Sequence, residues 1–224
     1  MKDLAFVLRR LSTILAVAVL TLTLIAASSG ILISFYYQPI AGGAYDSLKT
    51  MTSDIPFGWL MRTVHDIAGN GVIVVGLIQI VVMFLGERLR RSWLTAWVTG
   101  VLLTLTAIGL GWTAMILDWS QIGFWRLRIE LGIIESIPLV GGTLREILTG
   151  GSLGSVTVAH MYTLHSYVLS LAAVGLAIAH LAGLLVQERE LFQAQPSASA
   201  TAQEVSEEGV EVSSPGKAEV LAQS

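Results

Sequence analysis

Four long stretches of this chain contain no charged residue, and each is long enough to cross a bilayer as a helix. A membrane helix needs about 20 apolar residues. Of the 224 residues, 54% are hydrophobic and only 13% are charged, whereas a soluble domain carries about 25% charged residues. The sequence therefore predicts an all-α fold, a membrane four-helix bundle. The uncharged stretches are Leu11–Tyr37, Ile67–Gly86, Ser92–Leu117 and part of Ile147–Gln187, which place the helices at about 11–37, 64–86, 92–117 and 157–187 within a 1–190 bundle.

Basic residues between the stretches predict how the bundle crosses the membrane. They are dense before the first helix and in the short loop after the second. Short loops rich in Lys and Arg stay on the cytoplasmic side. We therefore expect an integral, multi-pass membrane protein with both termini in the cytoplasm, in which the second and fourth helices run in the same direction. The two basic clusters are Lys2, Arg9 and Arg10, and Arg88, Arg90 and Arg91.

Composition also limits what the rest of the chain can do. The segment 191–224 is rich in Ala, Ser, Gln and Glu and cannot bury enough apolar surface to order itself, so we predict a disordered acidic cytoplasmic tail. The net charge of −3 argues against a nucleic-acid partner. The absence of cysteine excludes disulfides, thiolate metal sites and thioether-linked haem.

The loop between the third and fourth helices, Asp118–Val156, holds two amphipathic stretches separated by "IPLVGG". They predict two short amphipathic helices at the membrane interface. Trp119, Phe124 and Trp125 suit the aromatic belt found there. A pair of interfacial helices that caps the bundle explains this pattern, and a binding site is the alternative.

Three histidines lie in or at the ends of the membrane stretches. His65 opens the second helix, His165 lies near the outer end of the fourth, and His180 lies deeper on the same helix. At about 1.5 Å and 100° per residue, His165 and His180 are about 22 Å apart along the axis and about 60° apart around it, so they share one face. Parallel helices bring His65 and His165 to the same depth.

An imidazole in hydrocarbon is costly without a partner. Hydrogen bonds between helices would satisfy His65 and His165, but two facing imidazoles also suit bis-histidine ligation of a haem iron. Zinc would need further ligands that the interior does not offer. Arg62, one turn before His65, is placed to pair with a haem propionate or to anchor the helix at the interface. Several glycines would leave room for a porphyrin or for close helix packing, namely Gly30, Gly69, Gly71, Gly76, Gly100, Gly109 and Gly111.

From about Gly30 to Ala182 the chain resembles the cytochrome b6 family, the four-helix N-terminal half of cytochrome b. The matching text includes "FYYQP", "FGWLMRTVH", "WVTGV", "DWSQIGFW", "ESIPLVGG" and "MYTLHSYVL". The resemblance implies a bundle that holds b haems and contributes to quinol oxidation on the outer side and quinone reduction on the inner side. His65, His165, Arg62, Gly30 and Gly111 match the family pattern.

The chain also departs from that pattern. The family carries a second histidine on the second helix, fourteen residues after the first, and Gln79 stands at that position opposite His180. We therefore expect one haem b, on the outer side. The inner site is either empty, our preferred interpretation, or holds a haem ligated by His180 alone, or a haem with Gln79 as a weak ligand. Further departures are Ala16, Asp66, Val82, Ala114, Asp118, Ser120, His160 and Ser170.

The resemblance further implies partners. In relatives the quinol site is shared with a separate C-terminal half of cytochrome b, which resembles subunit IV. A Rieske-type protein is a further expected partner. Trp119, Gln121, Phe124 and Trp125 would then form one wall of a quinone site, so we do not expect the chain to turn over quinol alone. Membrane lipid, quinone or quinol, and a second copy of the chain are the other expected partners.

Two other functions fit less of the sequence. One is a haem-poor structural or assembly subunit derived from cytochrome b6. The other is a stand-alone cytochrome of the b561 or nitrate-reductase gamma-subunit type, which also places histidines at two depths. The loop text "DWSQIGFW" speaks against the second of these functions.

Overall fold

The computed structural model describes residues 2–86 and 94–193, and every regular element in these ranges is a helix. The predicted all-α fold class is confirmed. Four helical segments are long and apolar enough to cross a membrane: Phe6–Ser34, Gly58–Leu85, Leu94–Leu117 and Ser155–Glu190. The chain divides into two compact units, 1–185 and 186–224. The elements are α1 (Lys2–Ser34), α2 (Ala44–Asp54), α3 (Gly58–Leu85), α4 (Leu94–Leu117), α5 (Gln121–Glu135), α6 (Gly141–Thr149), α7 (Ser155–Thr163), a π-helical segment Leu164–Leu169 and α8 (Ser170–Gln193).

The long helices differ from the predicted bounds in ways that the sequence explains. Helix α1 begins at Lys2 rather than near Leu11, and Arg9 and Arg10 are good helix formers that can extend their charged ends towards an interface. It ends at Ser34, and Pro39 disfavours a helical conformation at Gln38, so the helix could not continue far beyond this point. Helix α8 continues to Gln193, which takes in the first residues of the predicted tail. The rest of that tail, 194–224, lies outside the described residues.

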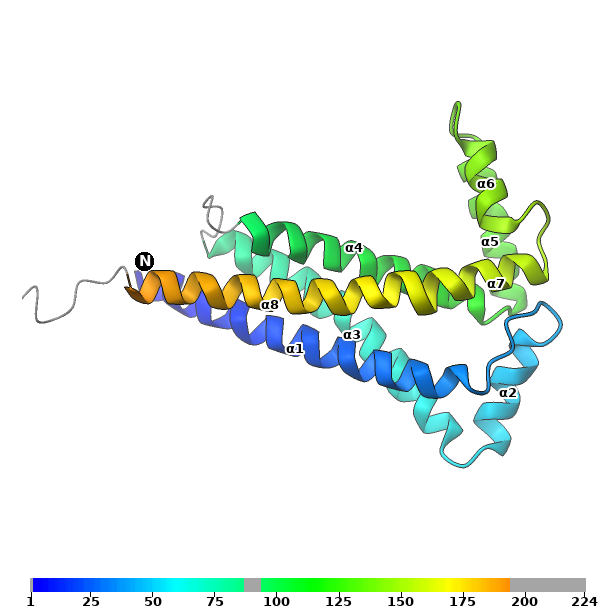
Figure 1. The fold of residues 1–224 in the computed structure, drawn as a ribbon, viewed down its shortest axis with the longest axis horizontal. Coiled ribbons are helices and arrows are strands. Elements are labelled where there is room, and N and C mark those ends of the chain that lie inside the picture. Colours follow the sequence, from blue (N-terminus) through cyan, green and yellow to red (C-terminus); the bar gives the residue numbers. More distant parts are fainter. Residues whose placement is uncertain (1, 87–93, 194–224) are drawn as a thin grey trace, which may run out of the picture. The chain divides into compact units, whose positions relative to one another are not determined.

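Within unit 1 the long helices run side by side and the short helices α2, α5 and α6 gather at one end (Figure 1). We call this the outer end. Helix α2 was not predicted, although Ala44, Leu48 and Met51 give it one buried face. The turn from α2 to α3 requires Gly58, because a Cβ there would overlap the carbonyl oxygen of Met51. The short helices predicted after α4 are present as α5 and α6.

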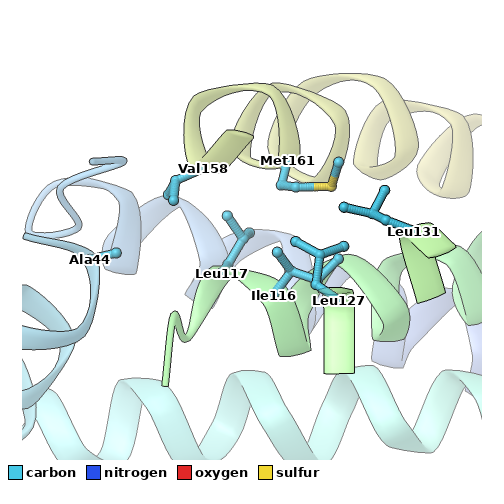
Figure 2. Close-up of a cluster of buried hydrophobic side chains, with 7 residues drawn as sticks. All are labelled: Ala44, Ile116, Leu117, Leu127, Leu131, Val158 and Met161. Atoms are coloured by element: carbon cyan, nitrogen blue, oxygen red, sulfur yellow. The ribbon is translucent and has the colours of Figure 1, made fainter. Parts of the chain in front are cut away.

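The interior of unit 1 has three apolar layers. Figure 2 shows the outer layer, where side chains from α2, α4, α5 and α7 point into one space. The middle layer joins α1, α3, α4 and α8, and the inner layer joins the same four helices nearer the start of α1. Two pairs of polar side chains lie between these layers. Each pair has one member on α3 and the other on the segment from α7 to α8. The layers comprise Ala44, Ile116, Leu117, Leu127, Leu131, Val158 and Met161; Val19, Val72, Leu103, Ala107, Ala173 and Ala177; and Ala16, Met83, Ala96 and Leu184.

The outer layer generates the first prediction. Leu127 is fully buried, whereas Ile122 on the same helix is 81% exposed. We expect Leu127→Ala to lower the free energy of unfolding by about 2–5 kcal/mol, because it leaves a cavity under α5. Ile122→Ala, the matched control, should change it by less than about 0.5 kcal/mol. Thermal unfolding in detergent micelles measures both, and equal effects would contradict the assigned packing of α5.

Candidate functional site

The outer polar pair consists of His65 on α3 and His165 in the π-helical segment. Their ring centres are 6.2 Å apart and their planes are inclined by 57°. Both rings are partly buried. Because Gln79 also meets His180, α3 and α8 run in the same direction, as the sequence predicts for the second and fourth helices.

The Nδ1 atoms of both histidines are anchored on neighbouring helices. Nδ1 of His65 lies 2.9 Å from the carbonyl oxygen of Ala26 on α1 and therefore donates its hydrogen there. Nδ1 of His165 lies 2.8 Å from the Thr113 hydroxyl on α4. That hydroxyl donates to a backbone carbonyl of its own helix, so it accepts from His165. Each ring is then a neutral imidazole whose Nε2 carries a lone pair.

The spacing of this pair suits a shared metal. Because a metal–imidazole bond is about 2 Å long and the ring centre lies about 1 Å beyond its nitrogen, two imidazoles on opposite sides of one metal have centres about 6 Å apart. Ligating histidines usually donate their other nitrogen to a carbonyl or a similar acceptor, as these two do. The described residues contain no cluster of three or more His, Asp or Glu for a bare ion. The pair therefore suits a metal whose remaining ligands belong to a macrocycle.

Local backbone features bring these rings together. A π-helical turn starts beside His165, and such turns often occur at functional sites. Gly30 on α1 lies against the His65 ring, where an added Cβ would come within 3.0 Å of Cε1. Gly111 on α4 lies against Ile73 instead, so its missing side chain serves helix packing. Of the two matching glycines, only Gly30 therefore contacts a histidine of the pair.

The inner polar pair is closed by a direct hydrogen bond. Nε2 of Gln79 lies 2.6 Å from Nε2 of His180 and 3.1 Å from the carbonyl oxygen of Ser12. Nδ1 of His180 lies 2.9 Å from the carbonyl oxygen of Ala96 and donates to it. Nε2 of His180 is therefore the acceptor, and the Gln79 amide occupies the lone pair that a metal would need.

Both side chains of the inner pair are almost fully enclosed. Gln79 is 3% exposed and His180 is 2% exposed. Oε1 of Gln79 is buried without a hydrogen-bond partner among the described residues. Beside it is a cavity of about 10 Å³, also lined by Thr104 and Gly100, which is about the size of one water molecule. One water in this cavity would satisfy the amide oxygen.

Arg62 is held by two carboxylates. Its Nη2 donates to Oδ1 of Asp118 at 2.6 Å, and Oδ2 of Asp66 lies 3.8 Å from its Nε. Asp118 also borders Tyr37, whose hydroxyl donates to the carbonyl oxygen of Leu117. Burial, and then the negative charge of Asp118, raise the pKa of the Tyr37 phenol above its usual value. Tyr37 therefore remains a neutral hydrogen-bond donor at this end of the bundle.

The aromatic residues of the third loop surround the start of α5. Trp119 meets Phe124 edge to face at 5.7 Å between ring centres, and Phe124 meets Trp125 in the same way at 5.5 Å. Gln121 and Trp125 lie on one open, nearly flat face of α5. Glu130 on the same face accepts hydrogen bonds from Trp112 and Arg126. This face is mostly apolar and carries the Arg126–Glu130 ion pair.

Comparison with known proteins identifies the family. The family model for cytochrome b/b6/petB matches residues 6–188, most of the chain. The chain belongs to the cytochrome b/b6 family. Cytochrome b6 of Gracilaria tenuistipitata var. liui is 34% identical over 163 residues, which cover 72% of this chain and 76% of the relative. Cytochrome b6 of Synechococcus elongatus is 34% identical over 151 residues, which cover 67% and 70% of the two chains.

A solved structure shares the fold. A chain of a hyperthermophilic respiratory Complex III superposes with a TM-score of 0.65 at 23% sequence identity. The match covers 77% of the present chain and 47% of the solved one, so the present chain corresponds to about half of that structure. This member of the cytochrome b/b6 family has four apolar spans and is an integral membrane protein. Membership of the family implies that it binds haem b.

The residues around the two pairs fit haem to different degrees. The outer pair has the anchoring and spacing of haem ligands, whereas Nε2 of His180 is already hydrogen-bonded. Sequence reasoning did not find the groups that hold the rings. Thr113 is one of several threonines on α4, so its sequence position does not single it out. Ala26 and Ala96 act through backbone carbonyl oxygens, which every residue has. The bond between Arg62 and Asp118 joins residues 56 positions apart and was also not predicted.

The inner pair generates the second prediction. A Cβ on Gly100 would lie 2.7 Å from Cε1 of His180, so Gly100→Ala should displace the ring and cost about 1–3 kcal/mol of stability. Gly175 lies in α8 with nothing within 4 Å of its added Cβ. Gly175→Ala should instead stabilise the helix by up to about 1 kcal/mol. Thermal unfolding in detergent separates the two variants, and a stabilised Gly100→Ala chain would contradict the geometry.

Proposed function

We propose that this chain is an electron-transfer subunit of a quinol–cytochrome reductase-like membrane complex, with one bis-histidine haem b held by His65 and His165. The observation that carries the proposal is the outer pair, in which both Nδ1 atoms are anchored and the ring centres stand 6.2 Å apart. The names of the relatives, cytochrome b6 and a respiratory Complex III chain, support membership of such a complex.

In this proposal the protein positions the cofactor and limits its chemistry. A bound haem would supply one-electron transfer. If His65 and His165 both held the haem iron, the group would be suited to electron transfer rather than to oxygen binding. Thr113 and the Ala26 carbonyl fix the tautomer and orientation of the ligands. Arg62 could hold a propionate only by sharing its guanidinium with Asp118.

The inner level is proposed to hold no haem. Gln79 satisfies His180 and Ser12 with its two amide hydrogens, which is the arrangement expected of a structural interhelical bond. Ligation by Gln79 or by His180 alone would require this bond to break. One carrier near the outer end cannot by itself span the hydrocarbon layer of about 30 Å. The chain would therefore exchange electrons at the outer side or through another subunit.

The proposed partners are inferred from the side chains around α5 at the outer end. Gln121 and Trp125 lie on the open face of α5, and Trp119 and Phe124 meet edge to face beside it. These four residues are proposed as one wall of a quinone site. A C-terminal cytochrome b half would complete it, with a Rieske-type protein as electron acceptor. The short basic loop and the basic N-terminus support an orientation with both termini in the cytoplasm, and a homodimer would match the symmetry common among oligomers.

The third prediction tests the proposed haem. We expect the pyridine haemochrome assay to give about one haem b per chain, because only the outer ligands are available. His65→Ala should abolish the low-spin b spectrum, whereas His180→Ala should keep it. Loss of the spectrum in His180→Ala with retention in His65→Ala would show that the haem lies at the inner level. A purified chain without haem would favour the haem-poor structural subunit.

The fourth prediction concerns the inner level alone. Gln79→His replaces the amide that occupies Nε2 of His180 with an imidazole that can act as a second ligand. The haem-to-protein ratio should rise from about one towards two, with a second low-spin component in the redox titration. Gln79→Leu, which removes the amide without supplying a ligand, serves as the control. Two haems in the unaltered chain would disprove the closed inner pair.

A further inference from the structure

One outward face of α3 changes character along its length. Towards the inner end it carries apolar side chains that suit lipid, such as Val74, Leu77 and Val81, each about half exposed. Nearer the outer end it carries Asp66 and Asn70, one helical turn apart and both exposed. The side chain of Asp66 is 59% exposed. An acidic group and an amide therefore face outwards from a helix that crosses the membrane.

These two side chains lie well below the outer interface. Trp59, near the start of α3, is 59% exposed and suits the aromatic belt that marks the membrane surface. Asp66 and Asn70 come seven and eleven residues later, which is about 10 and 16 Å deeper at 1.5 Å per residue. The hydrocarbon layer is about 30 Å thick, so Asn70 lies near its middle.

The surrounding protein does not satisfy the side chain of Asn70. The side chain of Asn70 makes no hydrogen bond to any residue in 2–86 or 94–193. Outward hydroxyls on α1 behave differently, because Thr21 and Ser28 donate to the carbonyl oxygen four residues earlier. Such an amide in lipid is costly, and residues of this kind normally face a partner.

The charges around Asp66 do not balance. Its nearest cation is Arg62 at 3.8 Å, but Arg62 is bound more closely by Asp118 at 2.6 Å. The group of Arg62, Asp66 and Asp118 therefore carries one net negative charge. A second copy would not balance it, because a two-fold axis along this face would place Asp66 opposite Asp66.

We propose that the face formed by Asp66, Ile67, Asn70 and Val74 is the contact surface for a transmembrane helix of another subunit. That helix carries a lysine or arginine at the depth of Asp66 and approaches closely enough to hydrogen-bond Asn70. Ile67 and Val74, 66% and 56% exposed, flank the polar groups and would pack against it. The proposal goes beyond the proposed electron transfer and does not depend on the number of haems.

Site-specific cross-linking tests this surface, because the chain has no native cysteine. Ile67→Cys, which leaves Asp66 and Asn70 intact, is labelled with a photoreactive maleimide in the host membranes of the full chain. Ile178→Cys on α8, 53% exposed, is the matched control. The cross-linked peptide is sequenced by mass spectrometry. We expect the Ile67→Cys chain, but not the Ile178→Cys chain, to capture a peptide from an apolar span of another protein, with Lys or Arg within one turn of the cross-link.

A second set of variants links that cross-link to the polar groups. Asn70→Leu in the Ile67→Cys chain should abolish the cross-link and lower the mass of the complex on a native gel. Val74→Leu should preserve both. Circular dichroism and the haem spectrum should stay unchanged, which separates loss of the partner from loss of the proposed function. Cross-linking to a second copy, to lipid alone, or to a peptide without a basic residue would overturn the proposal.

Discussion

Two levels of this bundle each hold a polar pair, His65 with His165 and Gln79 with His180. Each of these three histidines donates its Nδ1 hydrogen to an oxygen of another helix. In hydrocarbon an unsatisfied donor is costly, so these bonds are required once a histidine is placed there. They connect α3 to α1, the π-helical segment to α4, and α8 to α4. They also fix the tautomer, which leaves Nε2 as the nitrogen whose environment distinguishes the two levels.

The two levels share that organisation and differ by one side chain. At the outer level two Nε2 lone pairs belong to rings spaced as metal ligands, and a glycine of α1 lets one ring approach closely. At the inner level Gln79 reaches as far as a histidine would, but the nitrogen that faces His180 carries two hydrogens. It therefore donates to His180 and to the carbonyl oxygen of Ser12. A close contact at Gly100 then seats the His180 ring. The helices hold the two levels in the same way. Whether a level could bind a metal depends on whether the atom opposite the histidine Nε2 is a hydrogen-bond donor or a lone pair.

Much of this arrangement could be predicted from the sequence, because it depends on length and spacing. Bilayer-length apolar stretches predicted the four spans, and helix geometry placed the histidines at two levels. The family resemblance then identified Gln79 as the residue opposite His180. Helix α2 was not predicted, since an eleven-residue amphipathic segment is too short to stand out. The bond from Arg62 to Asp118 was not predicted either. It depends on where α4 ends relative to α3, and this is a tertiary fact without a local pattern.

The position of the outer pair has an energetic consequence for a cell. His65 lies near the start of α3, 14 residues before Gln79, and His165 lies 15 residues before His180. The two levels are therefore about 21 Å apart along the helices. Moving one elementary charge through the full membrane potential costs about 2.3 kcal/mol per 100 mV. In the proposed function, an electron that enters and leaves at the outer pair would cross about 9 Å of the layer, which is about a third of that field. Its redox equilibrium should therefore respond to membrane voltage less strongly than that of a carrier at the Gln79–His180 level.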